Sequence, residues 1–130
     1  MKHIISNIIS VILTTVIYLL GGLDIALISL LIVMSIDYIT GVLSALYNKK
    51  LNSKIGLKGI IKKVFYLCII ALCVVIDKLF GETGVIRSLI IYFFVANDGI
   101  SILENSAELN IKLPKKLYEA LEQLKEKGGK

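Results

Sequence analysis

The sequence predicts an all-α protein that crosses a membrane several times. Of its 130 residues, 56% are hydrophobic, and the mean hydropathy is +0.82, whereas soluble domains are about 45–50% apolar. A soluble domain of this length exposes too large a share of its surface to bury so much Leu, Ile and Val. The apolar residues form long runs without the alternation of a strand. A backbone in lipid must also satisfy its own hydrogen bonds, as a helix does.

Four apolar segments are long enough to be membrane spans. A bilayer core of about 30 Å needs about 20 helical residues, and about 17 to 25 are tolerated. We expect spans at residues 4–20, 25–47, 60–80 and 85–103, which together form a transmembrane domain over residues 1–103. The first span is at the short limit, so a three-span form, with this segment in the interface or inserted only conditionally, is the alternative. Because no small-residue cleavage site follows it, we expect an uncleaved span rather than a signal peptide.

Charge predicts the orientation of these spans. Six lysines and no acid lie in and just after the basic cytoplasmic loop predicted at residues 48–59: Lys49, Lys50, Lys54, Lys58, Lys62 and Lys63. Loops rich in lysine stay in the cytoplasm, so we expect this loop and both termini to be cytoplasmic. This topology explains the formal charge of +5. Aromatic residues are not interleaved with the basic ones, and we therefore expect no nucleic-acid binding.

We expect residues 104–130, which are rich in Lys and Glu, to form a charged cytoplasmic tail. Pro114 suits the first turn of a helix, and we expect a short helix at about residues 114–127. Leu117, Leu121 and Leu124 share one face of that helix, with Lys and Glu elsewhere. Such an amphipathic helix lies on a membrane surface or packs on the protein itself, and a regulatory contact is the alternative.

The sequence contains no motif of an enzyme. His3 is the sole histidine, so no metal site with His and Cys spacing is possible, and no phosphate-binding loop or nucleophile motif occurs. Cys68 and Cys73 lie about 140° apart around a helix, which prevents a bridge between them. We expect no catalysis, no metal and no cofactor.

Polar and small residues recur at helical spacing in two of the spans and therefore form stripes. The candidate pore-lining or helix-contact residues are Ser29, Asp37, Thr40, Gly41 and Ser44 in the second span and Asn97, Asp98 and Ser101 in the fourth. The third span is bulky and apolar, which suits contact with lipid or a scaffold role. Small and hydroxyl residues also serve close helix packing alone, so both interpretations stay open.

Asp37 and Asp98 are the two acids of these stripes. A carboxylate at mid-span costs about 2.5–3.5 kcal/mol on insertion scales, and it therefore needs a cavity, a partner or a proton. Both acids lie 12–13 residues from the outer end of their span, which places them at similar depth. Either they line one water-filled path, or one of them pairs with Lys58 or Lys62 near the inner face.

Two long blocks of the chain carry a family resemblance: "IDYITGVLSALYNKKLNSKIGLKGIIKK" and "FFVANDGISILENSAELNIKLPKKLYEALEQL". In this order and spacing, over residues 36–124, they resemble the toxin-secretion and phage-lysis holin family. The positions that match the family are Asp37, Tyr38, Thr40, Gly41, Lys54, Gly56, Lys58, Gly59, Asn97, Asp98, Gly99, Glu104 and Asn105. Asp98 stands where the family more often has Glu, a departure that keeps the charge.

The resemblance implies a small phage or prophage membrane protein without catalytic residues. Such a protein forms homo-oligomers in the bacterial cytoplasmic membrane and permeabilises it, which leads to host cell lysis by an endolysin or to toxin secretion. The implied partners are membrane lipid, further copies of the chain, an endolysin or exported toxin, and in some cases an antiholin. Our hypothesis is that oligomerisation hides or hydrates Asp37 and Asp98, and that loss of the membrane potential favours opening. The alternatives are a small ion or proton channel or transporter subunit, and a non-conducting antiholin-like regulator.

Overall fold

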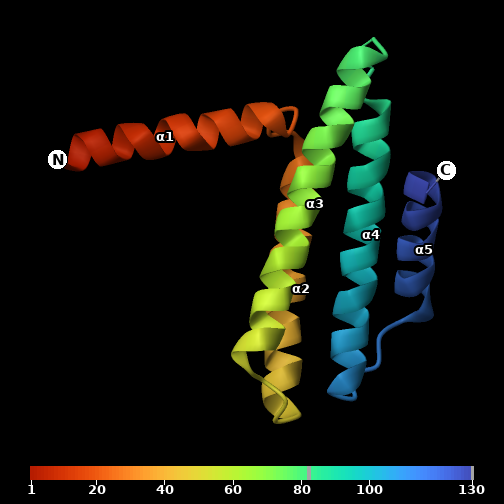
Figure 1. Cartoon of the computed structure of the whole chain (residues 1–130). Helices are drawn as coiled ribbons and strands as arrows, with labels where there is room; N and C mark the ends of the chain where they lie inside the picture. Colours follow the sequence, from red (N-terminus) through yellow and green to blue (C-terminus); the bar gives the residue numbers. More distant parts are fainter. Residues whose placement is uncertain (82, 130) are drawn as a thin grey trace.

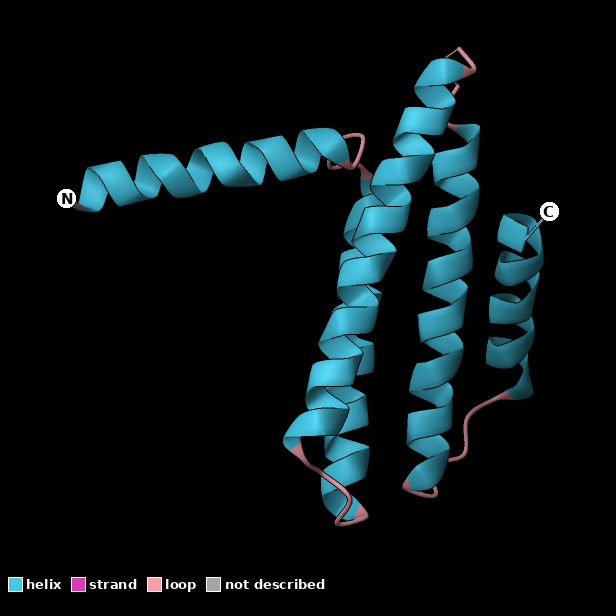
Figure 2. Cartoon of the chain, in the orientation of Figure 1, coloured by secondary structure: helices cyan, strands magenta, loops and turns pink. Residues whose placement is uncertain are grey.

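The computed structural model describes residues 1–81 and 83–129, and the described part consists of helices joined by short connections (Figures 1 and 2). The five helices are α1 (Lys2–Leu19), α2 (Ile25–Tyr47), α3 (Ser53–Leu79), α4 (Val85–Glu108) and α5 (Lys115–Gly129). Helices α1 to α4 are each long and apolar enough to cross a membrane. The prediction of an all-α chain with four candidate spans is therefore confirmed.

Capping side chains fix where three of the helices begin. Asp24 accepts a hydrogen bond from the backbone N–H of Leu27 at the start of α2, at 3.0 Å. Asn52 accepts one from Ile55 at the start of α3, at 2.9 Å. Such caps satisfy N–H groups that have no partner within the helix, and each contributes about 1 kcal/mol. The start of α4 is capped instead by a carboxylate from α3, described below.

Helices α2, α3 and α4 lie side by side along most of their length, and α4 contacts α2, α3 and α5 (Figure 1). We call the end with residues 48–52 and 109–114 the loop end, where the Asn48 amide donates to the Glu108 carboxylate at 3.1 Å. The opposite end, with residues 20–24 and the α3–α4 connection, is the turn end. The core between the helices is apolar and includes Leu27, Leu30, Met34, Tyr66, Ile70, Ile91 and Phe94.

Large apolar side chains also cover the outside of the bundle. Ile32, Ile39 and Leu43 on α2 are more than half exposed, as are Val64, Phe65 and Leu72 on α3. A water-soluble protein rarely shows so much contiguous apolar surface. The outer face of the bundle is therefore suited to lipid.

Helix α1 points away from the bundle to one side (Figure 1). None of its residues is buried, and its main link to the bundle is Lys78, whose ammonium group lies 4.6 Å from the centre of the Tyr18 ring. Gly21 and Gly22 have φ of 88° and 103°, values that a side chain disfavours. These two glycines set the direction in which α1 leaves α2.

Helix α5 packs antiparallel against α4 (Figure 1). Near its middle, Leu121 fills the space beside Gly99, where a Cβ would lie 2.7 Å from the leucine methyl carbon. Near its end, Gly128 lies so close to α4 that a Cβ there would be 2.5 Å from the carbonyl oxygen of Leu89. The short amphipathic helix predicted for the tail thus covers one face of α4.

Two helices run further than the hydropathy predicts. Helix α3 begins at Ser53 rather than near residue 60, and α4 continues to Glu108 rather than ending near residue 103. Lys54, Lys58, Lys62 and Lys63 therefore lie on a helix, and only Lys49 and Lys50 lie in the connection. The physical reason is that lysine is a good helix former and that the Asn52 cap, not the edge of the apolar run, starts α3.

Candidate functional site

A cluster of charged and polar side chains lies between α2, α3 and α4. Its three charged members are Asp37, Lys63 and Asp98, which lie ten residues from the loop end of their own helices (47 − 37, 63 − 53 and 108 − 98). At about 1.5 Å per residue, this places all three about 15 Å from that end. They therefore meet at one level, in the middle of an apolar bundle.

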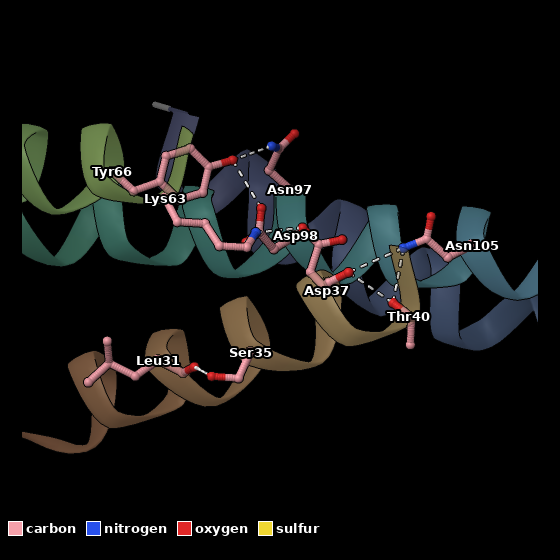
Figure 3. A network of polar contacts seen from close by, with 9 residues as sticks. All are labelled: Leu31, Ser35, Asp37, Thr40, Lys63, Tyr66, Asn97, Asp98 and Asn105. Carbon is pink, nitrogen blue, oxygen red and sulfur yellow. Dashed lines mark hydrogen bonds and ion pairs between the residues drawn. The ribbon is translucent and has the colours of Figure 1, made fainter. Parts of the chain in front are cut away.

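Lys63 bridges the two carboxylates (Figure 3). Its ammonium group donates to Asp37 Oδ2 at 2.8 Å and to Asp98 Oδ2 at 3.2 Å. The side chain of Asp98 is fully buried, and those of Asp37 and Lys63 are 12% and 13% exposed. Each ion would be costly in this position alone, and the pairing with further hydrogen bonds offsets that cost.

Neutral side chains satisfy the rest of the cluster. The Tyr66 hydroxyl donates to Asp98 Oδ1 at 3.0 Å, and the Asn97 amide donates to the Tyr66 oxygen at 2.7 Å. The ring of Tyr66 stacks on that of Phe94, with centroids 3.8 Å apart. Tyr66 thus has an apolar contact for its ring and polar partners for its hydroxyl.

A second set of bonds ties α4 to α2 one turn closer to the loop end (Figure 3). The Thr40 hydroxyl donates to the Asp37 carbonyl oxygen at 3.1 Å. The Asn105 amide donates to the Thr40 hydroxyl at 3.0 Å and lies 3.5 Å from the same carbonyl. Asn105 therefore holds the turn of α2 that carries Asp37.

The structure brings four of the eight candidate residues into this network, namely Asp37, Thr40, Asn97 and Asp98. Ser44 is buried. Gly41 faces α4, because a Cβ there would lie 3.7 Å from the Asn105 amide. Ser101 lines a groove beside the cluster. Ser29 stands apart, in a hollow near the turn end that Ser88 and Leu124 also line.

The sequence-based account of α3 was wrong on two points. The lysine that pairs with the acids is Lys63, not Lys58 or Lys62. This helix is also not merely an apolar scaffold, because it supplies Lys63 and Tyr66 to the cluster. Lys63 and Tyr66 lie one helical turn apart inside the span expected at residues 60–80. Two polar groups on one face of an apolar span were therefore visible in the sequence.

A groove of about 340 Å³ opens next to the cluster toward the loop end. Its walls come mainly from α2 and α3, and they combine apolar side chains with Lys58, Lys62 and the Asp37–Lys63 pair. The groove therefore connects the charged cluster with the basic end of the bundle.

Arg87, the only arginine of the chain, organises the turn end. Its guanidinium donates to the carbonyl oxygens of Leu20 at 2.6 Å and Gly22 at 3.0 Å, and it pairs with the Asp24 carboxylate at 2.8 Å. This hydrogen-bonded pair lowers the pKa of Asp24 below its ordinary value of 3.8. Gly21 is required here, because a Cβ would lie 2.5 Å from Arg87 Nε.

Asp77 of α3 completes this end. Its buried carboxylate accepts hydrogen bonds from the backbone N–H groups of Ile86 at 3.0 Å and Arg87 at 2.9 Å. A carboxylate at a helix N-terminus accepts hydrogen bonds from free N–H groups and is attracted by the positive end of the helix dipole. Asp77 and Arg87 together lock α1, α2, α3 and α4 at one point, and the polar stripes of the sequence did not indicate this contact.

In the part of the chain that the structure describes, no group of three His, Cys, Asp or Glu side chains is placed to hold a metal ion. Cys68 and Cys73 are both free thiols.

Several uncharacterized bacterial proteins are similar to this chain over most of its length. An uncharacterized 14.9 kDa protein of Clostridium perfringens, from the nagH 3′ region, is 45% identical over 111 residues, or 85% of this chain and 84% of the relative. An uncharacterized protein of Clostridium acetobutylicum is 39% identical over 109 residues, covering 83% and 87% of the two chains. The uncharacterized protein YqxH of Bacillus subtilis is 35% identical over 109 residues, covering 83% and 76%.

No solved structure matches this chain significantly. The sequence model of the bacteriophage holin family matches residues 14–126, which include α2 to α4, the charged cluster and most of α5. The match covers far more than half of the chain. With four apolar helices and this match, the protein is a membrane protein, and it belongs to the bacteriophage holin family.

Proposed function

We propose that this protein is a holin, which assembles in the bacterial cytoplasmic membrane and permeabilises it so that an endolysin or a toxin is released. The observation that carries the proposal is the Asp37–Lys63–Asp98 cluster, placed at mid-level in an apolar bundle. Within one chain these charges are paired and nearly buried, and the outer faces of α2 and α3 are apolar. A single copy therefore presents these apolar faces to lipid while the charges of the cluster are hidden.

Opening requires that the same groups turn to water. In the proposed assembly, α2, α3 and α4 of neighbouring copies rearrange, and Asp37, Lys63 and Asp98 become hydrated along a common path. The two carboxylates share one ammonium group, which leaves a formal charge of −1 when all three are ionised. Unpaired charge in lipid is unfavourable by several kcal/mol, so once the pairing breaks, a hydrated state is favoured over a dry one.

The proposed orientation places the loop end in the cytoplasm. Its connection and the first turns of α3 carry the lysines that the positive-inside rule assigns to that side, whereas at the turn end Lys78 and Arg87 are accompanied by Asp24 and Asp77. In the four-span arrangement both termini are cytoplasmic. That arrangement requires α1 to swing at Gly21–Gly22 from its sideways direction to one along the bundle, and the three-span form leaves α1 in the interface.

The direct test is inducible expression in a bacterium, with and without a co-expressed endolysin. The expected result is an abrupt stop of growth and loss of membrane potential, followed by lysis only in the culture that holds the endolysin. Replacing Asp37 with Leu should change the timing of lysis or abolish it while the membrane fraction holds as much protein as before. Ser35→Ala is the matched control, because the Ser35 hydroxyl is exposed and donates only to the Leu31 carbonyl of its own helix (Figure 3). Unchanged timing in the Asp37 variant would contradict the proposed mechanism.

The groove that runs from the basic end to Asp37 and Lys63 favours a second candidate function, a small ion or proton conductor. That protein would depolarise cells and show a defined, ion-selective conductance, but it would not release a cytoplasmic enzyme. A non-conducting regulator, the third class, would cause neither effect and would delay lysis by a partner holin. The same expression experiment separates the three.

A further inference from the structure

We propose that the groove between α2 and α3 at the loop end is a binding site for the phosphate headgroup of an anionic phospholipid. This goes beyond the proposed holin function, because it concerns which lipid the protein holds in any state. The groove has a volume of about 340 Å³, enough for a headgroup rather than for a protein segment.

The charge of the groove favours an anion. Lys58 and Lys62 both line it, and because they are four residues apart on α3 they lie on one face of the helix. In the described part of the chain, the ion pairs involve only Lys63 and Arg87 as cations, so the ammonium groups of Lys58 and Lys62 are not neutralised. Asp37 is the acid of the groove wall, and its carboxylate is already bound to Lys63 at 2.8 Å.

The shape of the groove gives a phosphate a defined place. Tyr38 of α2 lies against two glycines of α3, where a Cβ would be 3.3 Å from its hydroxyl at Gly56 and 3.4 Å from its ring at Gly59. The absence of side chains at these two positions lets the ring form the floor of the groove. In the part of the chain that the structure describes, the Tyr38 hydroxyl makes no intramolecular hydrogen bond that would compete with a ligand, and it can donate to a phosphate oxygen.

The remaining wall favours a lipid over a free phosphate ion. Val42, Leu51 and Ile55 line the groove beside the lysines, and Leu51 and Ile55 are 42% and 47% exposed. An inorganic ion gains nothing from this apolar surface, whereas the glycerol and upper acyl carbons of a phospholipid can cover it. Lys side chains above an apolar wall are the arrangement expected for anionic headgroups.

The groove also lies at the right depth. Helix α3 has 27 residues and is therefore about 40 Å long, about 10 Å more than a bilayer core. Lys58 and Lys62 stand five and nine residues after its first residue, Ser53, or about 8 and 14 Å along it. The long lysine side chains can extend from this depth toward the loop end, which brings both ammonium groups within reach of the headgroup layer.

The test is lipid retention by the purified full-length chain in a neutral detergent, measured by native mass spectrometry. The probes are phosphatidylglycerol, which is anionic, and phosphatidylcholine, which is not. We expect phosphatidylglycerol to be retained in preference, and the double variant Lys58→Gln/Lys62→Gln to bind it about thirty-fold more weakly, since each lysine near a surface contributes about 1 kcal/mol. Lys115→Gln/Lys116→Gln is the matched control, because it removes equal charge from α5 outside the groove.

Two further experiments distinguish binding in the groove from nonspecific attraction of the lipid by positive charge. Val42→Phe narrows the groove without changing charge, and it should also weaken phosphatidylglycerol binding while the helical content stays constant. Adding inorganic phosphate at the ionic strength of a chloride control should displace little lipid. Equal losses in the two double-lysine variants, equal retention of both lipids, or full displacement by phosphate would each overturn the proposal.

Discussion

The ammonium group of Lys63 lies 2.8 Å from the Asp37 carboxylate, although 26 residues separate the two in sequence. This contact joins α2 to α3, and through Asp98 it joins both to α4. A triad in which one cation serves two acids depends most on that cation, because its loss leaves two buried carboxylates without a counter-charge.

Replacing Lys63 with Met should destabilise the bundle strongly. The variant keeps the volume of the stem but leaves Asp37 and Asp98 facing each other without a cation, and breaking a buried pair costs about 3–5 kcal/mol. Thermal unfolding of the purified protein in detergent, followed by circular dichroism, measures the effect. Lys54→Met is the control, since Lys54 is exposed on the same helix and outside the ion pairs and the cation–π contact described for α3. Equal stability of the two variants would show that the triad is not structural.

Replacing Tyr66 with Phe should cost less, about 1–3 kcal/mol. The ring keeps its stack on Phe94, but Asp98 loses a donor and the Asn97 amide loses its acceptor. The measurement is again the unfolding midpoint in detergent, with Tyr47→Phe as control because that side chain is 66% exposed. If Tyr66→Phe matches the wild type, the hydroxyl has no net role in holding Asp98.

The sequence predicted the helices well because hydropathy and span length decide them, and it singled out Asp37 and Asp98 because an acid in lipid is costly. It did not predict which lysine pairs with them. Lys62 and Lys63 differ by about 100° around α3, and the choice between them depends on how that helix is rotated against α2 and α4. Hydropathy along one chain carries no information about that rotation.

The contacts of Arg87 were hidden for a similar reason. Its partners Leu20, Gly22 and Asp24 lie 63 to 67 residues away, so no helical periodicity connects them. The available signal was chemical: a lone arginine within an apolar segment needs acceptors, and the turn with Gly21 and Gly22 offers free carbonyls. Hydropathy also misplaced the start of α3. The Asn52 cap, and not the edge of the apolar run, determines that this helix begins at Ser53.

The Arg87–Asp24 pair should make stability depend on pH in a defined direction. The folded pKa of Asp24 is below 3.8, the value in the unfolded chain, so its contribution is fully present above that pH and is lost as the pH falls through the folded pKa. Asp24→Asn keeps an N-cap but removes the charge. The difference in unfolding midpoint between wild type and variant should therefore shrink below pH 3.8.

The size of this difference should be small. Because the Asp24 side chain is 52% exposed, we expect less than about 1 kcal/mol even at neutral pH. Glu119→Gln, an exposed substitution on α5, is the control and should show no such convergence. A difference that grows on acidification would contradict the assigned pairing.

Helix α5 and lipid compete for the same face of α4. Leu121 and Gly128 pack on α4, while Glu119, Glu122 and Glu126 are exposed. If α4 crosses the membrane with α5 still docked, these charges meet the hydrocarbon, at about 2.5–3.5 kcal/mol for each one near the centre. Release of α5 should therefore accompany the exposure of this face to lipid or to another copy.

A reversible cross-link between Gly99→Cys and Leu121→Cys tests this competition, in a background where Cys68 and Cys73 are replaced with Ala. In the docked form a Cβ at position 99 lies 3.5 Å from the Leu121 Cγ, which is close enough for a disulfide after small adjustments. The oxidised protein, added to vesicles loaded with a dye, should release the dye much more slowly than the reduced protein. The single variant Leu121→Cys, oxidised in the same way, controls for the substitution, because it keeps Gly99 and adds no Cβ between the helices. Equal release before and after reduction would mean that α5 stays docked while the membrane is permeabilised.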